Sequence, residues 1–128
     1  MVAFTKLDVS RKARELLVTG WAQAHAAKTE RGDSTYLFGV DAKCFCLSGA
    51  LSRAAFELGG FALRQVGMPR PEYHRSEARR VAGAVYADLQ QELGGAEPYE
   101  WNDEPCRTQA EVLGLLDKVI ARLEKEAA

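Results

Sequence analysis

Four stretches of the chain place apolar or small residues three or four positions apart, and this spacing constrains the fold more than any other feature of the sequence. The stretches are Ser10–Ala27, Cys44–Leu58, Ser76–Leu93 and Gln109–Glu124. Because an α-helix completes one turn in about 3.6 residues, each stretch would present one apolar face along a helix. The sequence therefore predicts four amphipathic helices packed around one core.

The ends of these stretches carry helix-capping residues. Thr108-Gln-Ala-Glu111 is a capping box directly before the fourth helix. Asp8 or Ser10 is the expected N-cap of the first helix, and Ser76 that of the third. Glycine pairs at 59–60 and 94–95 predict the ends of the second and third helices. The second stretch is rich in small residues that allow a close approach of neighbours, so we expect it to be the most buried helix.

The connecting segments are expected to hold little regular structure. Thr35–Val40 contains residues that favour strands and predicts a short extended piece. Phe61–Leu63 predicts a turn or two of helix, after which Pro69 and Pro71 forbid a long one. The predicted fold class is mainly α, a compact bundle of about four helices with at most a short strand or hairpin in the connecting loops. It would form a single domain over residues 1–128.

Charge, hydropathy and cysteine content narrow the classes of function. The formal net charge of −1 creates no global field that would attract nucleic acid or an anionic membrane. No apolar run approaches the roughly 20 residues of a membrane span, and no membrane association is expected. Three cysteines cannot all pair within one chain, which favours free thiols and a cytosolic, reducing compartment.

The loop before the fourth helix contains Trp101, Asn102 and Asp103 in succession. The first expectation is structural: Trp101 anchors the loop to the core with its indole N–H hydrogen-bonded, and the next two residues form an Asx turn. A binding role is the alternative, because loops on rigid scaffolds often carry functional groups.

Cys46 is the candidate nucleophile of a thiol enzyme. We expect it in the first turn of the second helix, where unpaired N–H groups would activate a thiol that points outward. His25 would be the base, and Asn102 or Asp103 the group that orients it. The alternative is a small core cysteine that packs against a neighbouring helix.

Metal, cofactor and nucleic-acid sites have weaker support in the sequence. The cysteines at 44, 46 and 106, even with His25 or His74, lack the paired spacing of structural zinc sites, so no metal is expected. No phosphate-binding or other cofactor motif is present, so no cofactor is expected. Basic residues cluster in two places, which a solvated helix face explains, although contact with nucleic-acid phosphates is a minor alternative. The clusters are Arg11, Lys12 and Arg14, and Arg70, His74, Arg75, Arg79 and Arg80.

Two strings occur together in a distinctive order: Cys46-Leu-Ser-Gly-Ala-Leu51 and Trp101-Asn-Asp-Glu-Pro-Cys-Arg-Thr108. With Gly20-Trp21 and Gln23, they resemble an uncharacterised family of small bacterial and phage proteins. The resemblance covers most of the chain and implies no activity. It implies that the Cys46 turn and the Trp101 loop meet in space, and that the family's characteristic positions are Trp21, Gln23, Cys46, Gly49, Trp101, Asn102, Asp103 and Arg107.

Three hypotheses of function follow. The favoured hypothesis is a small cytosolic binding or adaptor domain whose protein partner contacts a patch formed by the Cys46 helix start and the Trp101–Asp103 loop. This hypothesis predicts an exposed apolar patch near Trp101 or Phe38. The second is a thiol-dependent hydrolase or transferase with Cys46 as nucleophile, which leaves enzymatic activity open. The third is nucleic-acid association through Arg70–Arg80. The sequence does not specify the oligomeric state.

Overall fold

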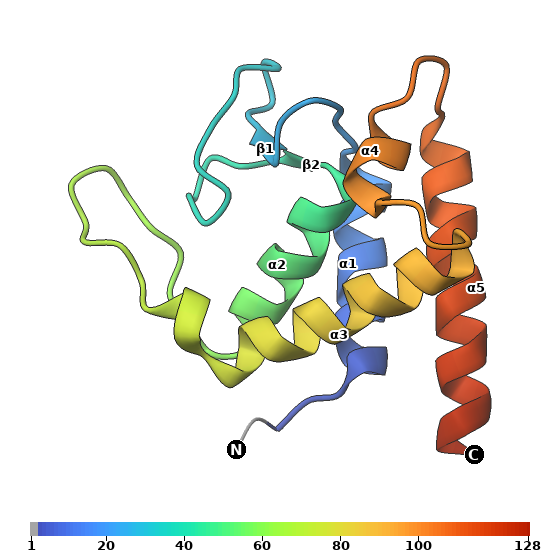
Figure 1. The fold of residues 1–128 in the computed structure, drawn as a ribbon. Coiled ribbons are helices and arrows are strands. Elements are labelled where there is room, and N and C mark those ends of the chain that lie inside the picture. Colours follow the sequence, from blue (N-terminus) through green and yellow to red (C-terminus); the bar gives the residue numbers. More distant parts are fainter. Residues whose placement is uncertain (1–2) are drawn as a thin grey trace.

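The computed structural model describes residues 3–128 and contains four long helices, one short helix and a two-stranded hairpin (Figure 1). The predicted fold class is confirmed. The elements in chain order are α1 (Lys6–Thr19), β1 (Ala27–Lys28), β2 (Cys44–Phe45), α2 (Leu47–Leu58), the 3₁₀ turn η1 (Tyr73–Arg75), α3 (Glu77–Glu92), α4 (Pro98–Asn102) and α5 (Gln109–Ala127).

Helix α1 is displaced relative to the prediction. It begins after Thr5, whose side chain forms a capping box with Asp8, and it ends at Thr19 rather than continuing to Ala27. A side chain at the next residue, Gly20, would collide with the backbone of Lys43, the residue directly before β2. The helix therefore ends where the chain passes close to this segment. The apolar spacing continues after this point because residues 21–27 are partly buried without being helical.

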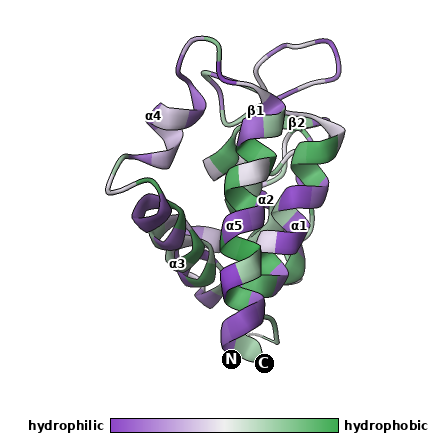
Figure 2. Cartoon of the chain, turned by 90° about the vertical axis from the view of Figure 1, so that its right-hand side faces the viewer, coloured by the Kyte–Doolittle hydropathy of each residue, from purple (hydrophilic) through white to green (hydrophobic). Residues whose placement is uncertain are grey.

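Helix α2 is the central helix, as predicted, and packs against both α1 and α3 (Figure 1). Eight of its twelve residues are buried. The long helices carry hydrophobic residues toward one another and hydrophilic residues on their outer sides, a pattern clearest on α3 and α5 in Figure 2. The buried side chains form one cluster that draws on all four long helices, and apolar burial of this kind is the main favourable term in folding.

Helices α3 and α5 begin at the predicted caps. The Ser76 side chain accepts from the third N–H of α3, and Thr108 and Glu111 form the expected capping box at the start of α5. Ion pairs then tie the helices together across the surface. The basic residues of α1 pair with acidic residues of three helices: Arg11 with Glu124 and Arg14 with Asp117 of α5, Lys12 with Glu57 of α2, and Lys6 with Asp88 of α3.

The connecting segments differ from the prediction in three places. The hairpin pairs β1 with β2 in antiparallel register, whereas Thr35–Val40 makes only an isolated bridge from Gly39 to Arg64. Phe61–Leu63 is not helical, and the single helical turn of this connection lies at η1. The segment before α5 was expected to be a loop but contains helix α4, which Pro98 begins at a position where its missing N–H is not needed. No helix within residues 3–128 is long and apolar enough to cross a membrane.

Candidate functional site

Asn102, the last residue of α4, joins three distant segments of the chain. Its side chain is fully shielded from solvent. The carboxamide oxygen accepts from the indole N–H of Trp21 at 2.8 Å and from the backbone N–H of Leu47 at 3.1 Å. The amide nitrogen donates to the Ala22 carbonyl oxygen at 3.1 Å and to a carboxylate oxygen of Asp103 at 2.8 Å. Because an asparagine side chain offers two donor and two acceptor positions, its capacity is filled.

Gln23 and Asp103 add bonds between the same segments. The Gln23 amide nitrogen donates to the backbone carbonyl oxygens of Asn102 at 2.9 Å and Glu104 at 3.0 Å. The Asp103 carboxylate accepts from the backbone N–H of Ala24 at 2.9 Å, where the chain has a φ of 70°. The predicted Asx turn is wrong, because both side chains bond residues 21–24 instead of their own backbone. We call residues 21–24, 46–49 and 101–104 the Asn102 junction.

Cys46 is the N-cap of α2, one position before its first helical residue. The Sγ atom accepts from the backbone N–H of Gly49 at 3.2 Å and lies 3.4 Å from the Ser48 hydroxyl. Its own N–H donates to the Ala26 carbonyl oxygen, and the residue is 8% exposed. The thiol is therefore turned into the helix end that it caps.

Gly49 permits a close backbone contact at the same place. A Cβ atom at this position would overlap the carbonyl group of Ala26. Only a residue without a side chain lets the first turn of α2 lie against the segment before β1. The spacing between Cys46 and Gly49 thus combines a cap with a steric opening. The hydrogen bond from the Leu47 N–H to Asn102 then joins the Cys46 turn to the α4 segment, as the resemblance implied.

Comparison with protein-family models gives a match over residues 1–122 to a family of unknown function, DUF6197. The chain belongs to this family. Comparisons with the curated proteins and with the solved structures found no match. Membership confirms the predicted family resemblance and assigns no activity, so the function must be argued from the geometry.

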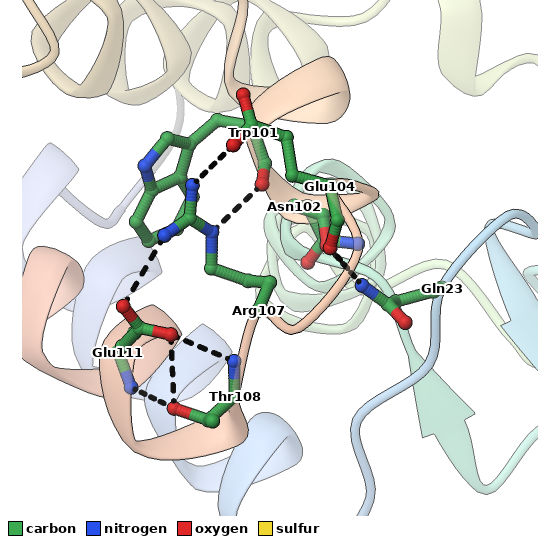
Figure 3. Close-up of polar contacts among 7 residues, drawn as sticks. All are labelled: Gln23, Trp101, Asn102, Glu104, Arg107, Thr108 and Glu111. Atoms are coloured by element: carbon green, nitrogen blue, oxygen red, sulfur yellow. Dashed lines mark hydrogen bonds and ion pairs between the residues drawn. The ribbon is translucent and has the colours of Figure 1, made fainter.

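Arg107 holds the outer side of the junction (Figure 3). Its guanidinium carbon lies 3.9 Å from the ring centroid of Trp101, and its Nε donates to the backbone carbonyl oxygen of the same residue at 2.9 Å. The remaining guanidinium nitrogens pair with Glu104 at 3.0 Å and Glu111 at 3.3 Å. Trp101 packs against the core as predicted, but no hydrogen bond of its indole N–H occurs within residues 3–128; the bonded indole is that of Trp21.

The three candidates for catalysis lie close in sequence or space but do not form a catalytic arrangement. His25 is exposed, and within the described residues neither it nor Asp103 hydrogen-bonds the Cys46 thiol. Asp103 is committed to the junction. No group of three or more His, Cys, Asp or Glu side chains that could hold a metal occurs in the chain from residue 3 onward.

A second region, which includes Phe38, has an exposed apolar surface. The loops 34–42 and 61–72 lie on the side of the molecule away from α5 (Figure 1) and are joined by backbone bonds between Val40, Arg64 and Phe38. Two hollows of about 370 and 420 Å³ adjoin Tyr36. We call residues 35–41 and 64–74 the loop face.

Buried Arg53 fixes this face from below. One of its Nη atoms donates to the carbonyl oxygens of Leu37 at 2.9 Å and Gly39 at 3.1 Å, and its Nε pairs with Glu57 at 2.7 Å. The side chain also lies over the ring of Phe45. An arginine inside an apolar helical face is the signal that could have located this loop, because a buried guanidinium needs several acceptors.

Proposed function

We propose that the protein is a small binding domain that captures an apolar segment of a partner protein carrying acidic residues, and that the loop face is its binding surface. One observation carries the proposal: large apolar side chains are exposed beside hollows and beside arginines without ion pairs. The favoured sequence hypothesis placed an apolar patch near Trp101 or Phe38, and the loop face includes Phe38. The Asn102 junction would support this surface rather than contact the partner.

The apolar part of the face consists of side chains that water surrounds in the free protein. Tyr36 and Val40 are each 44% exposed, Met68 is 42% exposed, and Val66 is exposed over its whole side chain. Tyr36, Val40 and Val66 line one hollow together. Removing such surface from water on binding gives about 25 cal/mol per Å² of apolar area, and tyrosine, methionine and arginine are enriched at protein interfaces.

The charge of the face favours an acidic partner, because two arginines line its hollows against one carboxylate, Asp41, which already accepts from the Thr35 hydroxyl at 2.9 Å. Arg64 and Arg70 each line one of the hollows, and neither forms an ion pair with the residues from 3 to 128. The Nε of Arg64 is shielded from solvent and has no hydrogen-bond partner in the same part of the chain. At this hollow a partner's carboxylate would pair with the guanidinium group of Arg64 in a charge-assisted bond, which is about twice as strong as a neutral one.

The face is already formed in the free protein, which lowers the entropy lost on binding. Phe38 stacks on Phe56 of α2 with ring centroids 4.2 Å apart and also meets Tyr73 edge to face. Arg53 holds the backbone on either side of this ring. The three free cysteines support the cytosol as the compartment in which such a partner would be met.

The alternative hypotheses have less support. A thiol enzyme needs a base beside its nucleophile, and the Cys46 thiol caps α2 instead. In the basic region proposed for nucleic acid, Arg80 pairs with Glu77, and Arg79 lies at a separate cavity. Both remain predictions, and the Cys46 variant described below bears on the first of them.

The test is a selection of peptides from a displayed random library on the full chain, followed by fluorescence anisotropy of the recovered peptides. We expect Asp or Glu beside Leu, Ile, Val or Phe in the selected sequences. Val66→Ser and Arg64→Gln should each raise Kd by roughly tenfold, because each removes about 1.4 kcal/mol or more at the face. The matched controls Val18→Ser and Arg31→Gln change exposed residues outside the two hollows and should leave Kd unchanged.

Cys46→Ser distinguishes binding from thiol chemistry. A serine hydroxyl caps a helix at least as well as a thiol, so the fold and Kd should both be unchanged. The proposal is overturned if no peptide is enriched, if binding is insensitive to both variants of the loop face, or if C46S abolishes binding while its melting curve is unchanged.

A further inference from the structure

A cavity of about 270 Å³ lies between α2 and α3, and its lining shares no residue with the two hollows of the loop face. Helix α2 lines it with Ser48, Leu51 and Ser52, and α3 with Arg79, Ala82, Gly83 and Tyr86. The cavity exists because small residues face each other where larger ones would close the space between the helices. Its volume equals that of roughly nine water molecules in the liquid, so it suits a small organic molecule.

Gly83 keeps the cavity open without a backbone reason for glycine. It lies within α3 at helical backbone angles, and a Cβ atom built on it would meet nothing within 4 Å. Glycine inside a helix is destabilising relative to alanine. The position could therefore hold a larger residue, and glycine leaves the space free.

One end of the cavity has two side chains that can bind an anion, Ser52 and Arg79, and the Tyr73 hydroxyl lies next to them without lining the cavity itself. The Tyr73 hydroxyl is shielded from solvent, in a residue that is 5% exposed, and makes no hydrogen bond within residues 3–128. Burial raises the pKa of Tyr73, while its neighbours Ser52 and Arg79 lower it. Both neighbours line the cavity, and Arg79 has no ion pair to a described residue. A buried donor without a partner destabilises the free protein.

The rest of the cavity lining is mostly apolar, with Ser48 as a further polar residue, and a carboxylate near it disfavours a second negative charge. Leu51, Ala82 and the ring of Tyr86 form the apolar part, and the Tyr86 hydroxyl donates to Glu97 at 2.6 Å. Burial first, and then the bond to Glu97, raise the pKa of Tyr86 to about 12, so this hydroxyl is neutral at physiological pH. A dianion such as phosphate would have one cation beside it and a carboxylate nearby, whereas a monoanion with an apolar body fits both ends.

We propose that this cavity binds a small monocarboxylate with an apolar body. The guanidinium of Arg79 and the Ser52 hydroxyl would bind the carboxylate, with Tyr73 donating to Ser52 behind it. The apolar body would lie against Leu51 and Ala82. The site would share Tyr73 with the loop face but no lining residue with its two hollows apart from that, and it does not depend on the proposed partner.

The experiment titrates the full ¹⁵N-labelled chain with benzoate, and in parallel with benzamide and inorganic phosphate. Benzoate should shift the amide resonances of Ser48, Ser52 and Gly83 and should raise Tm. Benzamide has the same shape without the charge and should bind roughly tenfold more weakly or not at all, because charge-assisted hydrogen bonds exceed neutral ones. Preferential binding of phosphate, equal binding of benzamide, or no binding of benzoate would each overturn the proposal.

Matched variants locate the site. Arg79→Gln should weaken benzoate binding by roughly tenfold, whereas Arg80→Gln, whose side chain pairs with Glu77 outside the cavity, should not. Gly83→Leu should fill the cavity and abolish binding, and Gly114→Leu provides the control for a helical glycine with equally open space. Binding that survives G83L would contradict the placement.

Tyr73→Phe separates a role of the hydroxyl in binding from a role in stability. It removes the unpaired donor and leaves the aromatic packing, so the free protein should melt at the same temperature or higher. Benzoate binding should nevertheless become weaker. A Y73F variant that binds benzoate as tightly as the unmodified chain would show that the hydroxyl has no part in the site.

Discussion

Replacing Asn102 should lower the free energy of unfolding more than replacing any other side chain of similar size. Asn102→Ala removes four hydrogen bonds and leaves the N–H of Leu47, the carbonyl of Ala22 and the indole N–H of Trp21 without partners. The first two groups belong to buried residues, and each buried group left unpaired costs about 1 to 3 kcal/mol. With the space vacated by the side chain, we expect a loss of about 3 to 6 kcal/mol in the free energy of unfolding.

Asn102→Asp tests the directions of the same bonds at almost constant volume. It keeps an oxygen for Trp21 and Leu47, but it places a second oxygen against the Ala22 carbonyl and the Asp103 carboxylate. Two donors are lost and two repulsive contacts appear, so the loss should be about 2 to 4 kcal/mol at neutral pH.

Urea denaturation followed by circular dichroism and tryptophan fluorescence measures both losses. The m-value should be unchanged, since the surface exposed on unfolding is the same. Gln91→Ala, an exposed amide on α3, is the control and should change stability by less than about 0.5 kcal/mol. A loss below about 1 kcal/mol for N102A, at an unchanged m-value, would refute the reasoning that the junction depends on this side chain.

Three further predictions concern the caps and glycines. Gly49→Ala should destabilise the fold by about 1 to 3 kcal/mol, because its Cβ atom would overlap a backbone carbonyl group. Gly83→Ala, whose Cβ atom would lie in open space, should stabilise the fold by up to about 1 kcal/mol. Urea denaturation measures both changes in the free energy of unfolding. The pKa of Glu111 is lowered from its ordinary 4.5, mainly by the backbone N–H of Thr108. Its contribution is therefore present above that value and is lost as the pH falls through the lowered pKa, so the stability difference between wild type and Glu111→Ala should shrink on acidification; a constant difference would contradict this. Cys106→Gly relieves a φ of 68° and should raise stability by about 1 kcal/mol, seen as an increase of a few degrees in Tm; a lower Tm would oppose that account.

Helices whose ends depend on neighbouring residues could be predicted from the sequence. The capping box at Thr108 and the serine cap at Ser76 were found because each involves groups three positions apart. The end of α1 could not be found in this way. It depends on Gly20 meeting the backbone of Lys43, and the apolar spacing continued past Gly20 because burial against β2 produces the same pattern as a helical face.

The junction was predicted only in outline. The family resemblance implied that the Cys46 turn and the Trp101 loop meet, but local rules assigned Asn102 to a turn and gave the hydrogen-bonded indole to Trp101 instead of Trp21. These errors have one cause: a side chain that can bond its own backbone can equally bond a segment some 80 residues away. The loop face and the α2–α3 cavity arise from the tertiary packing of segments with no shared motif.

Hydrogen exchange of the two tryptophan indole N–H groups, followed by NMR, tests most directly whether the Asn102 junction is a fixed structural element. The chain has two tryptophans, so the two indole signals can be assigned from a single-site variant. The Trp21 N–H, bonded to buried Asn102, should exchange only when the protein unfolds globally, while the Trp101 N–H should exchange much faster. Rapid exchange of both indoles would contradict the account, because it would mean that the junction opens freely in the folded protein.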